Sequence, residues 1–62
     1  MSIGENLRAL RMKRGLTQGE LAEMVGVTRA FLCQMERGTK ALSLPLAKEI
    51  SEVLNCGIAD LV

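Results

Sequence analysis

Glycine divides this chain into short segments, most clearly between Thr17 and Gly38. Gly26 and Gly38 each follow a segment whose apolar residues recur at helical spacing. Glycine suits the position just after a helix, where a positive φ is needed. The pattern therefore predicts one helix at 18–25 and a second at 29–37, joined by a tight turn. Helices this short are marginal alone, so both are expected to pack against the rest of the chain.

Both predicted helices begin with a recognisable cap. Thr17 is followed three residues later by Glu20, which is the pattern of a capping box, and Thr28 is a suitable N-cap for the second helix. Gly19 does not fit the helical pattern as well, because glycine inside a helix destabilises the helix by about 1 kcal/mol relative to alanine. Helical spacing gives each helix one inward face, formed by Leu21, Ala22 and Val25 in the first and by Leu32, Met35 and Glu36 in the second.

Gly15 and Asn55 stand where further helices would end. The segment 3–14 carries an apolar stripe of Ile3, Leu7 and Leu10. Another helix begins near the N-cap Ser43 with Pro45 in its first turn, and its inward residues are Leu46, Ala47, Ile50, Val53 and Leu54. One short turn at 58–61 would place Ile58 and Leu61 inward. Pro45 interrupts the short apolar alternation around it, which argues against a strand, so we expect a single all-α domain over 1–62.

Several functional classes are disfavoured by what the sequence lacks. It has no histidine, and Cys33 and Cys56 form no Cys-x-x-Cys pattern, so neither a metal site nor a disulfide framework is expected. It shows no nucleophile–base pair, phosphate loop or carboxylate cluster, so we expect no enzyme, no cofactor and no small-molecule ligand. It has no secretory leader and no apolar run of membrane-spanning length, so we expect a cytoplasmic protein without a membrane partner.

The net charge of +1 does not by itself indicate nucleic acid. The basic residues are nevertheless concentrated in residues 1–16 and 28–40, whereas residues 17–27 and 41–62 carry an acidic excess. A basic face built from the first and third helical segments is therefore possible on a nearly neutral protein. A mixed surface that serves only solubility explains the charge equally well.

Taken together, these positions make the chain resemble the phage-repressor and Cro-like (XRE-type) helix-turn-helix family. The matching residues are Leu16, Thr17, Gln18, Leu21, Ala22, Gly26, Val27, Thr28, Leu32, Glu36, Arg37, Gly38, Ser43, Leu44, Leu46, Ala47, Ile50 and 58–61. The resemblance implies a compact five-helix bundle, the lambda-repressor-like DNA-binding domain. It also implies a bacterial, archaeal or phage-encoded transcriptional regulator, with repression as the expected role, that binds double-stranded DNA as a homodimer on a palindromic site.

The same resemblance makes the helix at 28–37 the recognition helix. It places Arg29, Ala30 and Gln34 at base edges, with Phe31 and Cys33 beside them. These residue types suit the role, because arginine can pair with guanine, glutamine with adenine, and an apolar side chain with a thymine methyl. The expected phosphate contacts are Thr17, Gln18, Thr28, Arg37, Thr39 and Lys40.

Two further expectations concern structure. The family pairs the glutamate at position 36 with an arginine of the first helix, here Arg11, and the simpler interpretation is a weak surface ion pair. The C-terminal residues Leu54, Ile58, Leu61 and Val62 are the candidate dimer interface, but they could equally close the core of the monomer.

A rival function is also open at this point. The chain could be a protein-interaction module that keeps the fold with little DNA binding, such as an antitoxin-like or anti-repressor partner. The near-neutral charge and Phe31, expected at the partly exposed rim of the second motif helix, favour that interpretation slightly. Cys33 is more simply a small filler than a redox switch, because no resolving cysteine accompanies it.

Overall fold

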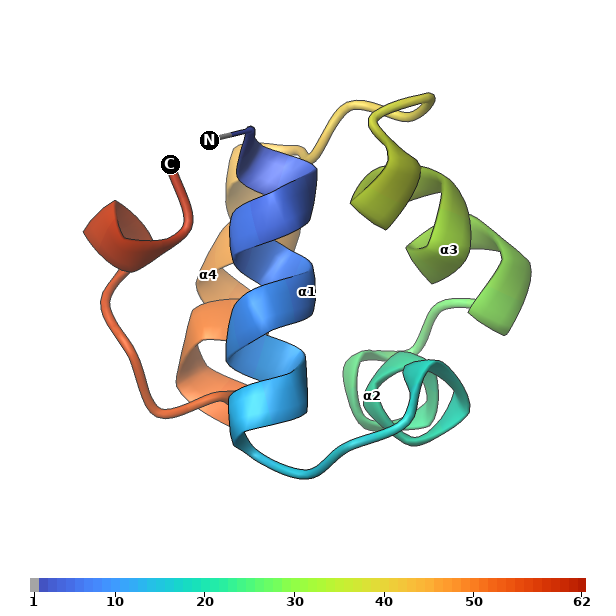
Figure 1. Cartoon of the computed structure of the whole chain (residues 1–62), viewed down its shortest axis with the longest axis horizontal. Helices are drawn as coiled ribbons and strands as arrows, with labels where there is room; N and C mark the ends of the chain where they lie inside the picture. The colour runs from blue at the N-terminus through green and yellow to red at the C-terminus, as the bar shows by residue number, and fades with distance from the viewer. Residues whose placement is uncertain (1) are drawn as a thin grey trace.

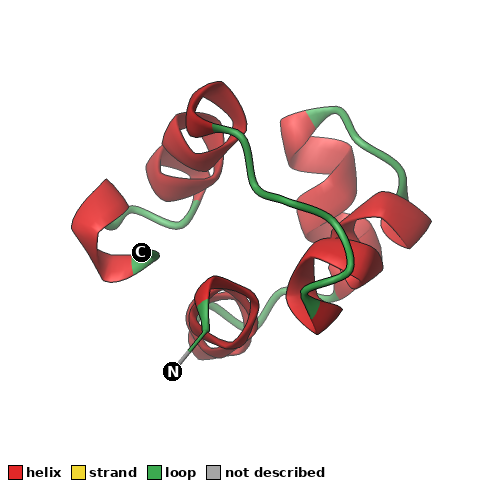
Figure 2. Cartoon of the chain, turned by 90° about the horizontal axis from the view of Figure 1, so that it is seen from above, coloured by secondary structure: helices red, strands yellow, loops and turns green. Residues whose placement is uncertain are grey.

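A computed structural model describes residues 2–62 of the chain. It contains four α-helices, α1 (Ile3–Lys13), α2 (Gln18–Val25), α3 (Arg29–Arg37) and α4 (Leu44–Val53), followed by the 3-10 turn η1 (Ile58–Asp60) (Figure 1). No strand occurs within residues 2–62, so the all-α prediction is confirmed. Helix α3 packs against α1 and α2, and α2 also packs against α4. Figure 2 shows the helices grouped around one centre, and the buried apolar residues of all four helices form a single cluster.

The prediction of five helices is wrong in its last member. The segment after Gly57 forms only a three-residue 3-10 turn. Its amides at Asp60 and Leu61 bond to the carbonyls three residues earlier, at 3.0 and 2.9 Å. Three residues are too few to build the i→i+4 ladder of an α-helix. The fold is therefore a bundle of four α-helices closed by one tight turn.

The predicted helix ends are confirmed by the cap geometry. Thr17 and Glu20 form the expected capping box, while the hydroxyls of Thr28 and Ser43 each accept an amide N–H from the first turn of α3 and α4. A second capping box, between Ser2 and Glu5, starts α1. The residues expected at positive φ all adopt it: Gly15, Gly26, Gly38 and Asn55, at 71°, 76°, 83° and 53°.

The core is aliphatic, as a chain with one aromatic residue requires. Six side chains have no exposed surface, namely Leu7, Leu21, Leu32, Ile50, Leu54 and Leu61. Every residue predicted to face inward in α2 and α3 is buried. The prediction for Ile3 is wrong, because its side chain is 42% exposed.

Gly4 takes the buried position next to Ile3 at the start of α1. A Cβ added there would lie 2.5 Å from the carbonyl oxygen of Glu36 and 2.6 Å from that of Met35. The first turn of α1 thus lies directly on the backbone at the end of α3. A larger side chain has no room at this crossing. The buried side of α1 is formed by Gly4, Leu7 and Arg11, and Ile3 lies off that side toward solvent.

Helix α1 also holds the C-terminal part of the chain. The Arg14 guanidinium donates to the carbonyls of Leu54 and Asn55, at 2.7 and 3.1 Å, and satisfies acceptors left free at the end of α4. The amide of Asn6 donates to the carbonyl of Leu61 at 2.9 Å. These bonds fix the segment after α4 against α1.

The expected dimer surface is corrected by the same packing. Leu54 and Leu61 have no exposed surface in the monomer, so they close its core and cannot form a patch shared with a second copy. Ile58 is half-buried and Val62 is 65% exposed. Only these two of the four expected residues are available to a partner.

Candidate nucleic-acid interface

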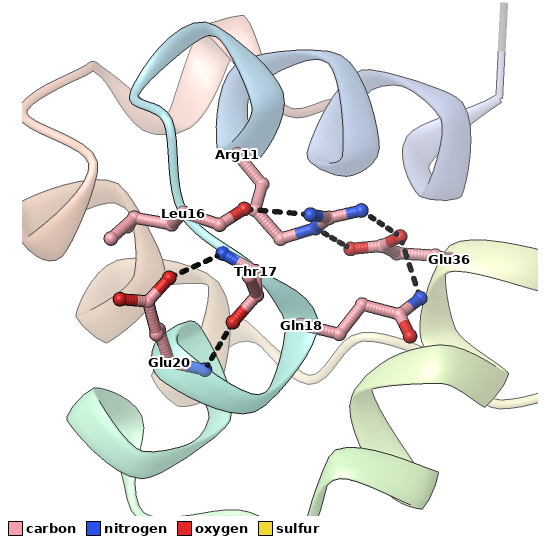
Figure 3. A network of polar contacts seen from close by, with 6 residues as sticks. All are labelled: Arg11, Leu16, Thr17, Gln18, Glu20 and Glu36. Carbon is pink, nitrogen blue, oxygen red and sulfur yellow. Dashed lines mark hydrogen bonds and ion pairs between the residues drawn. The ribbon is translucent and has the colours of Figure 1, made fainter.

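A buried polar network joins α1, α2 and α3 through the carboxylate of Glu36. Arg11 donates from Nε to Glu36 Oε2 at 2.7 Å and from Nη2 to Oε1 at 3.1 Å (Figure 3). Its Nη1 donates to the carbonyl of Leu16 at 2.7 Å. The side chains of Arg11 and Glu36 are only 10% and 3% exposed. The ion pair implied by the family resemblance is therefore present and buried, and it is not the weak surface pair.

The network has a third member that the sequence did not reveal. Gln18, the first residue of α2, donates from Nε2 to Glu36 Oε1 at 3.1 Å (Figure 3). One carboxylate thus accepts hydrogen bonds from α1 and from α2 while belonging to α3. This arrangement sets the orientation of α3 relative to the N-terminus of α2.

Helix α3 divides into a buried and an exposed side. Leu32, Met35 and Glu36 face the core. The outer side consists of residues that the sequence proposed for DNA contact: Thr28, Arg29, Ala30, Gln34 and Arg37 are exposed, and Phe31 and Cys33 are half-buried. Phe31 packs at the edge of the core, as expected of a residue at the rim. The helix therefore presents its polar and small side chains outward as a continuous face.

A groove runs between α1, the N-terminus of α2 and α3. The exposed arginines Arg8, Arg29 and Arg37 line it, and the Arg11–Glu36 pair contributes to its wall. A smaller hollow beside it is lined by Gln18, Arg29, Ala30 and Cys33. Three side chains with a permanent positive charge around one concave surface favour an anionic ligand.

The groove collects some of the proposed site residues and omits others. Thr17, Gln18, Arg29, Ala30, Cys33 and Arg37 line one or both hollows, whereas Thr28, Phe31, Gln34, Thr39 and Lys40 do not. Arg8 also lines the groove, although the sequence had not indicated it as a DNA-contacting residue. The sequence suggested only that its charge lies beside the motif. The sequence did contain a signal for this position: Arg8 lies one helical turn before Arg11, which places the two residues on the same side of the helix.

Several of the proposed phosphate ligands already have partners within the chain. The Thr17 hydroxyl accepts the Glu20 N–H at 3.1 Å, and the Thr28 hydroxyl accepts the Phe31 N–H at 3.0 Å. The Thr39 hydroxyl donates to the carbonyl of Gln34 at 3.1 Å. The long cationic side chains of Arg37 and Lys40 are exposed. Arg37 and Lys40 are therefore the proposed ligands with the greatest freedom to reach a phosphate.

Within residues 2–62, the pKa values of Glu20 and Cys56 are displaced. The Thr17 backbone N–H, helped by the Thr17 hydroxyl, lowers the pKa of the Glu20 carboxyl below 4.5. Burial raises the pKa of the Cys56 thiol, with the charge of Asp60 adding to the effect and Arg14 opposing it. Cys56 is thus held in its neutral form and packs against the core.

Across residues 2–62 the structure brings together no group of three or more side chains suited to hold a metal. Within the same part of the chain, no helix combines the length and apolar character needed to cross a membrane.

Comparison with known proteins agrees with the architecture. The helix-turn-helix family profile HTH_3 matches residues 7–61. A putative HTH-type transcriptional regulatory protein of Thermococcus kodakarensis is 42% identical over 57 residues, and Antitoxin PezA of Streptococcus pneumoniae is 38% identical over 60. These alignments cover 92% and 97% of this chain, which spans only 18% and 38% of those relatives.

Among solved structures, the P22 c2 repressor in complex with a synthetic operator superposes with a TM-score of 0.92 at 31% identity. That match covers 100% of this chain and 94% of the repressor chain. Sequence profile, relatives and fold agree on one assignment. The chain belongs to the HTH_3 (XRE-type) helix-turn-helix family of transcription regulators.

Proposed function

We propose that this protein is a sequence-specific DNA-binding repressor of transcription that reads the major groove with α3. The observation that carries this proposal is the outer side of α3, where Arg29, Ala30 and Gln34 are exposed while the opposite side is buried. An α-helix fits the major groove, and its exposed side chains then meet the base edges. The P22 c2 repressor, which has the same fold and was solved in complex with a synthetic operator, supports DNA binding.

Each outward residue has a chemical role in the proposal. Arg29 donates two hydrogen bonds to O6 and N7 of a guanine, and Gln34 pairs with N6 and N7 of an adenine. Ala30 and the exposed part of Phe31 contact thymine methyl groups. Cys33, half-buried between them, is small enough to let the helix approach the bases.

The phosphate contacts flank this reading surface. Arg37 and Lys40 lie at and beyond the end of α3, and Arg8 adds a cation from α1. Thr17 and Gln18 bring the N-terminus of α2, where free backbone N–H groups and the helix dipole favour an anion. The Gln18 side chain keeps its second amide N–H for this purpose, because the first bonds to Glu36. Thr28 adds its hydroxyl proton, because the hydroxyl oxygen only accepts within the chain. Thr39 joins the set only by exchanging the Gln34 carbonyl, to which its backbone N–H and its hydroxyl both donate, for a phosphate.

A homodimer on a palindromic site is part of the proposal. One copy offers few base contacts, and two copies read half-sites about 34 Å apart in this class of motif. The residues available for the interface are the half-buried Ile58 and the exposed Val62. Sedimentation equilibrium with and without DNA measures the assembly, and Val62→Asp should weaken it without unfolding the monomer.

Selection of bound sequences from a random DNA pool tests the function. We expect enrichment of a palindrome, and fluorescence anisotropy should then show that affinity for the selected duplex exceeds that for a scrambled duplex by 10³-fold or more. Affinity for both should fall steeply as salt rises. A selection that enriches no sequence, with weak binding at low salt, would reject the proposal.

The second candidate is a protein-interaction module of the same fold, acting as an antitoxin-like or anti-repressor partner. The similarity to Antitoxin PezA and the net charge of +1 favour it. The two functions differ in the same titration, because an interaction module would show neither sequence preference nor steep salt dependence toward DNA.

A further inference from the structure

Gly19 is not explained by the fold. It is the second residue of α2, where glycine weakens a helix. Its φ is not in the left-handed region, which is reached only by Gly15, Gly26, Gly38 and Asn55 among the described residues. No backbone of another element lies against it either, in contrast to Gly4. Neither the backbone conformation nor close helix packing requires glycine at this position.

The space beside Gly19 is bounded by two side chains of the proposed reading surface. A Cβ added at Gly19 would lie 4.0 Å from Cδ of Arg29 and 4.0 Å from the hydroxyl oxygen of Thr17. Cδ of Arg29, on α3, therefore lies beside the first turn of α2, at the outer end of ordinary contact with a methyl group at residue 19. It lies over the one residue of that turn that has no side chain, and both Gly19 and Arg29 line the groove between the helices.

The size of residue 19 consequently limits where the Arg29 guanidinium can be. A methyl group at residue 19 would lie at ordinary contact distance from Arg29 and Thr17. A longer side chain would extend from the Cβ position into the space between the Arg29 stem and the Thr17 hydroxyl. A glutamine would compete with Arg29 for this space. A glutamate would also attract the guanidinium and neutralise its charge.

We propose that Gly19 is a positioning residue for sequence recognition, which leaves the space in which Arg29 lies and so determines whether Arg29 reaches its base pair. This inference rests on the proposed function, since it assigns Arg29 to a base. It makes Gly19 a specificity determinant that touches no DNA itself. The helix-weakening residue in α2 is then matched to the arginine opposite it in α3.

The test compares Gly19→Ala, Gly19→Gln and Gly19→Glu, each alone and combined with Arg29→Ala. All three variants should melt no lower than the parent chain, because each residue has a higher helix propensity than glycine. Gly19→Ala should keep the base preference. Gly19→Gln and Gly19→Glu should lose preference at the base pair that Arg29→Ala relaxes, by roughly 10-fold or more, the scale of one bidentate base contact. In the Arg29→Ala background neither should change that preference further.

A uniform loss of affinity would overturn the positioning role. If Gly19→Gln and Gly19→Glu weaken all duplexes alike, and equally with Arg29→Ala, residue 19 acts through α2 or through bulk charge. A measurement without DNA separates this outcome from failure of the proposed function. A nuclear Overhauser effect between the Gly19 α-protons and the Arg29 δ-protons supports the placement of Arg29, and its absence overturns the inference. Failure of the unmodified chain to select DNA, with that effect present, rejects the proposed function and the base-reading role while leaving the Gly19–Arg29 contact established.

Discussion

Arg11 and Glu36 form a two-bond ion pair between α1 and α3 in which neither side chain is more than 10% exposed. Loss of one partner would leave the other charge buried and uncompensated. Glu36→Ala should therefore lower the free energy of unfolding by about 3–5 kcal/mol, and the exposed Glu23→Ala by less than about 0.5 kcal/mol. Urea denaturation followed by circular dichroism measures both. Equal midpoints for the two variants would show that the pair contributes little.

Substitution by alanine should change the free energy of unfolding in opposite directions at Gly4 and Gly19. At Gly4 the new methyl group would meet the Glu36 carbonyl oxygen at 2.5 Å, so Gly4→Ala should force α1 away from α3 and destabilise the fold by about 1–3 kcal/mol. At Gly19 the methyl group fits, so Gly19→Ala should stabilise the fold by about 0.5–1 kcal/mol through helix propensity. Thermal melts measure both effects: the melting temperature should fall in Gly4→Ala and rise in Gly19→Ala. A stabilising Gly4→Ala would contradict the close helix crossing.

Arg14 should contribute to stability through the end of α4. Arg14→Ala removes charged donors from the carbonyls of Leu54 and Asn55 and should cost about 1–2 kcal/mol, discounted for the exposure of the site. Hydrogen exchange at the amides of 54–62 should accelerate in the same variant. Arg8→Ala is the matched control on α1, since Arg8 lines the groove instead. It should leave exchange unchanged and weaken DNA binding.

Acid should weaken the capping box of α2. The folded pKa of Glu20 is below its ordinary value of 4.5, so its stabilising effect is fully present above pH 4.5 and is lost as the pH falls through the folded value. Glu20→Gln should reduce the difference in melting temperature between pH 7 and pH 3, because an uncharged amide caps equally at both. Glu23→Gln, without a cap to lose, should retain the full difference. An unchanged difference in Glu20→Gln would mean that the carboxylate does not serve the cap.

Loss of a base contact and loss of a phosphate contact should have different effects on DNA binding. Arg29→Ala should relax preference at one base pair by about 1–3 kcal/mol and leave other positions intact. Lys40→Ala should weaken all duplexes alike and reduce the slope of log affinity against log salt by about 1 for each half-site. Anisotropy titrations on single-substitution duplexes across a salt series measure both effects. An unchanged consensus in Arg29→Ala would exclude that residue from base reading.

The parts of this molecule that were predictable from the sequence are those determined by neighbouring residues. Thr17, Thr28 and Ser43 cap helices because of residues three positions away, and the glycines end helices through their own φ. Contacts that depend on distant segments were mostly missed. No local pattern shows that Gly4 meets the backbone of α3, or that Arg14 reaches the end of α4.

The errors at Ile3 and in the expected dimer surface have a related cause. Periodicity identifies the side of a helix that faces inward, but not how deep each residue lies. The buried side of α1 is formed by Gly4, Leu7 and Arg11, so Ile3 lies off it. Leu54 and Leu61 face inward, as their spacing predicted, but they are buried too deeply to contact a partner. The Arg11–Glu36 pair was reached through the family resemblance, because the sequence alone does not relate α1 to α3.

Gln18 and Arg11 both bond to the carboxylate of Glu36, so the rotation of α3 about its own axis is settled when the chain folds. The outward residues of α3 take no part in that arrangement. An exposed residue such as Gln34 can therefore be exchanged without disturbing this network, whereas an exchange of Arg29 has to match the residue at position 19. If α3 reads DNA as proposed, one buried carboxylate holds the reading helix in place, and the choice of base is left to the exposed side chains of that helix.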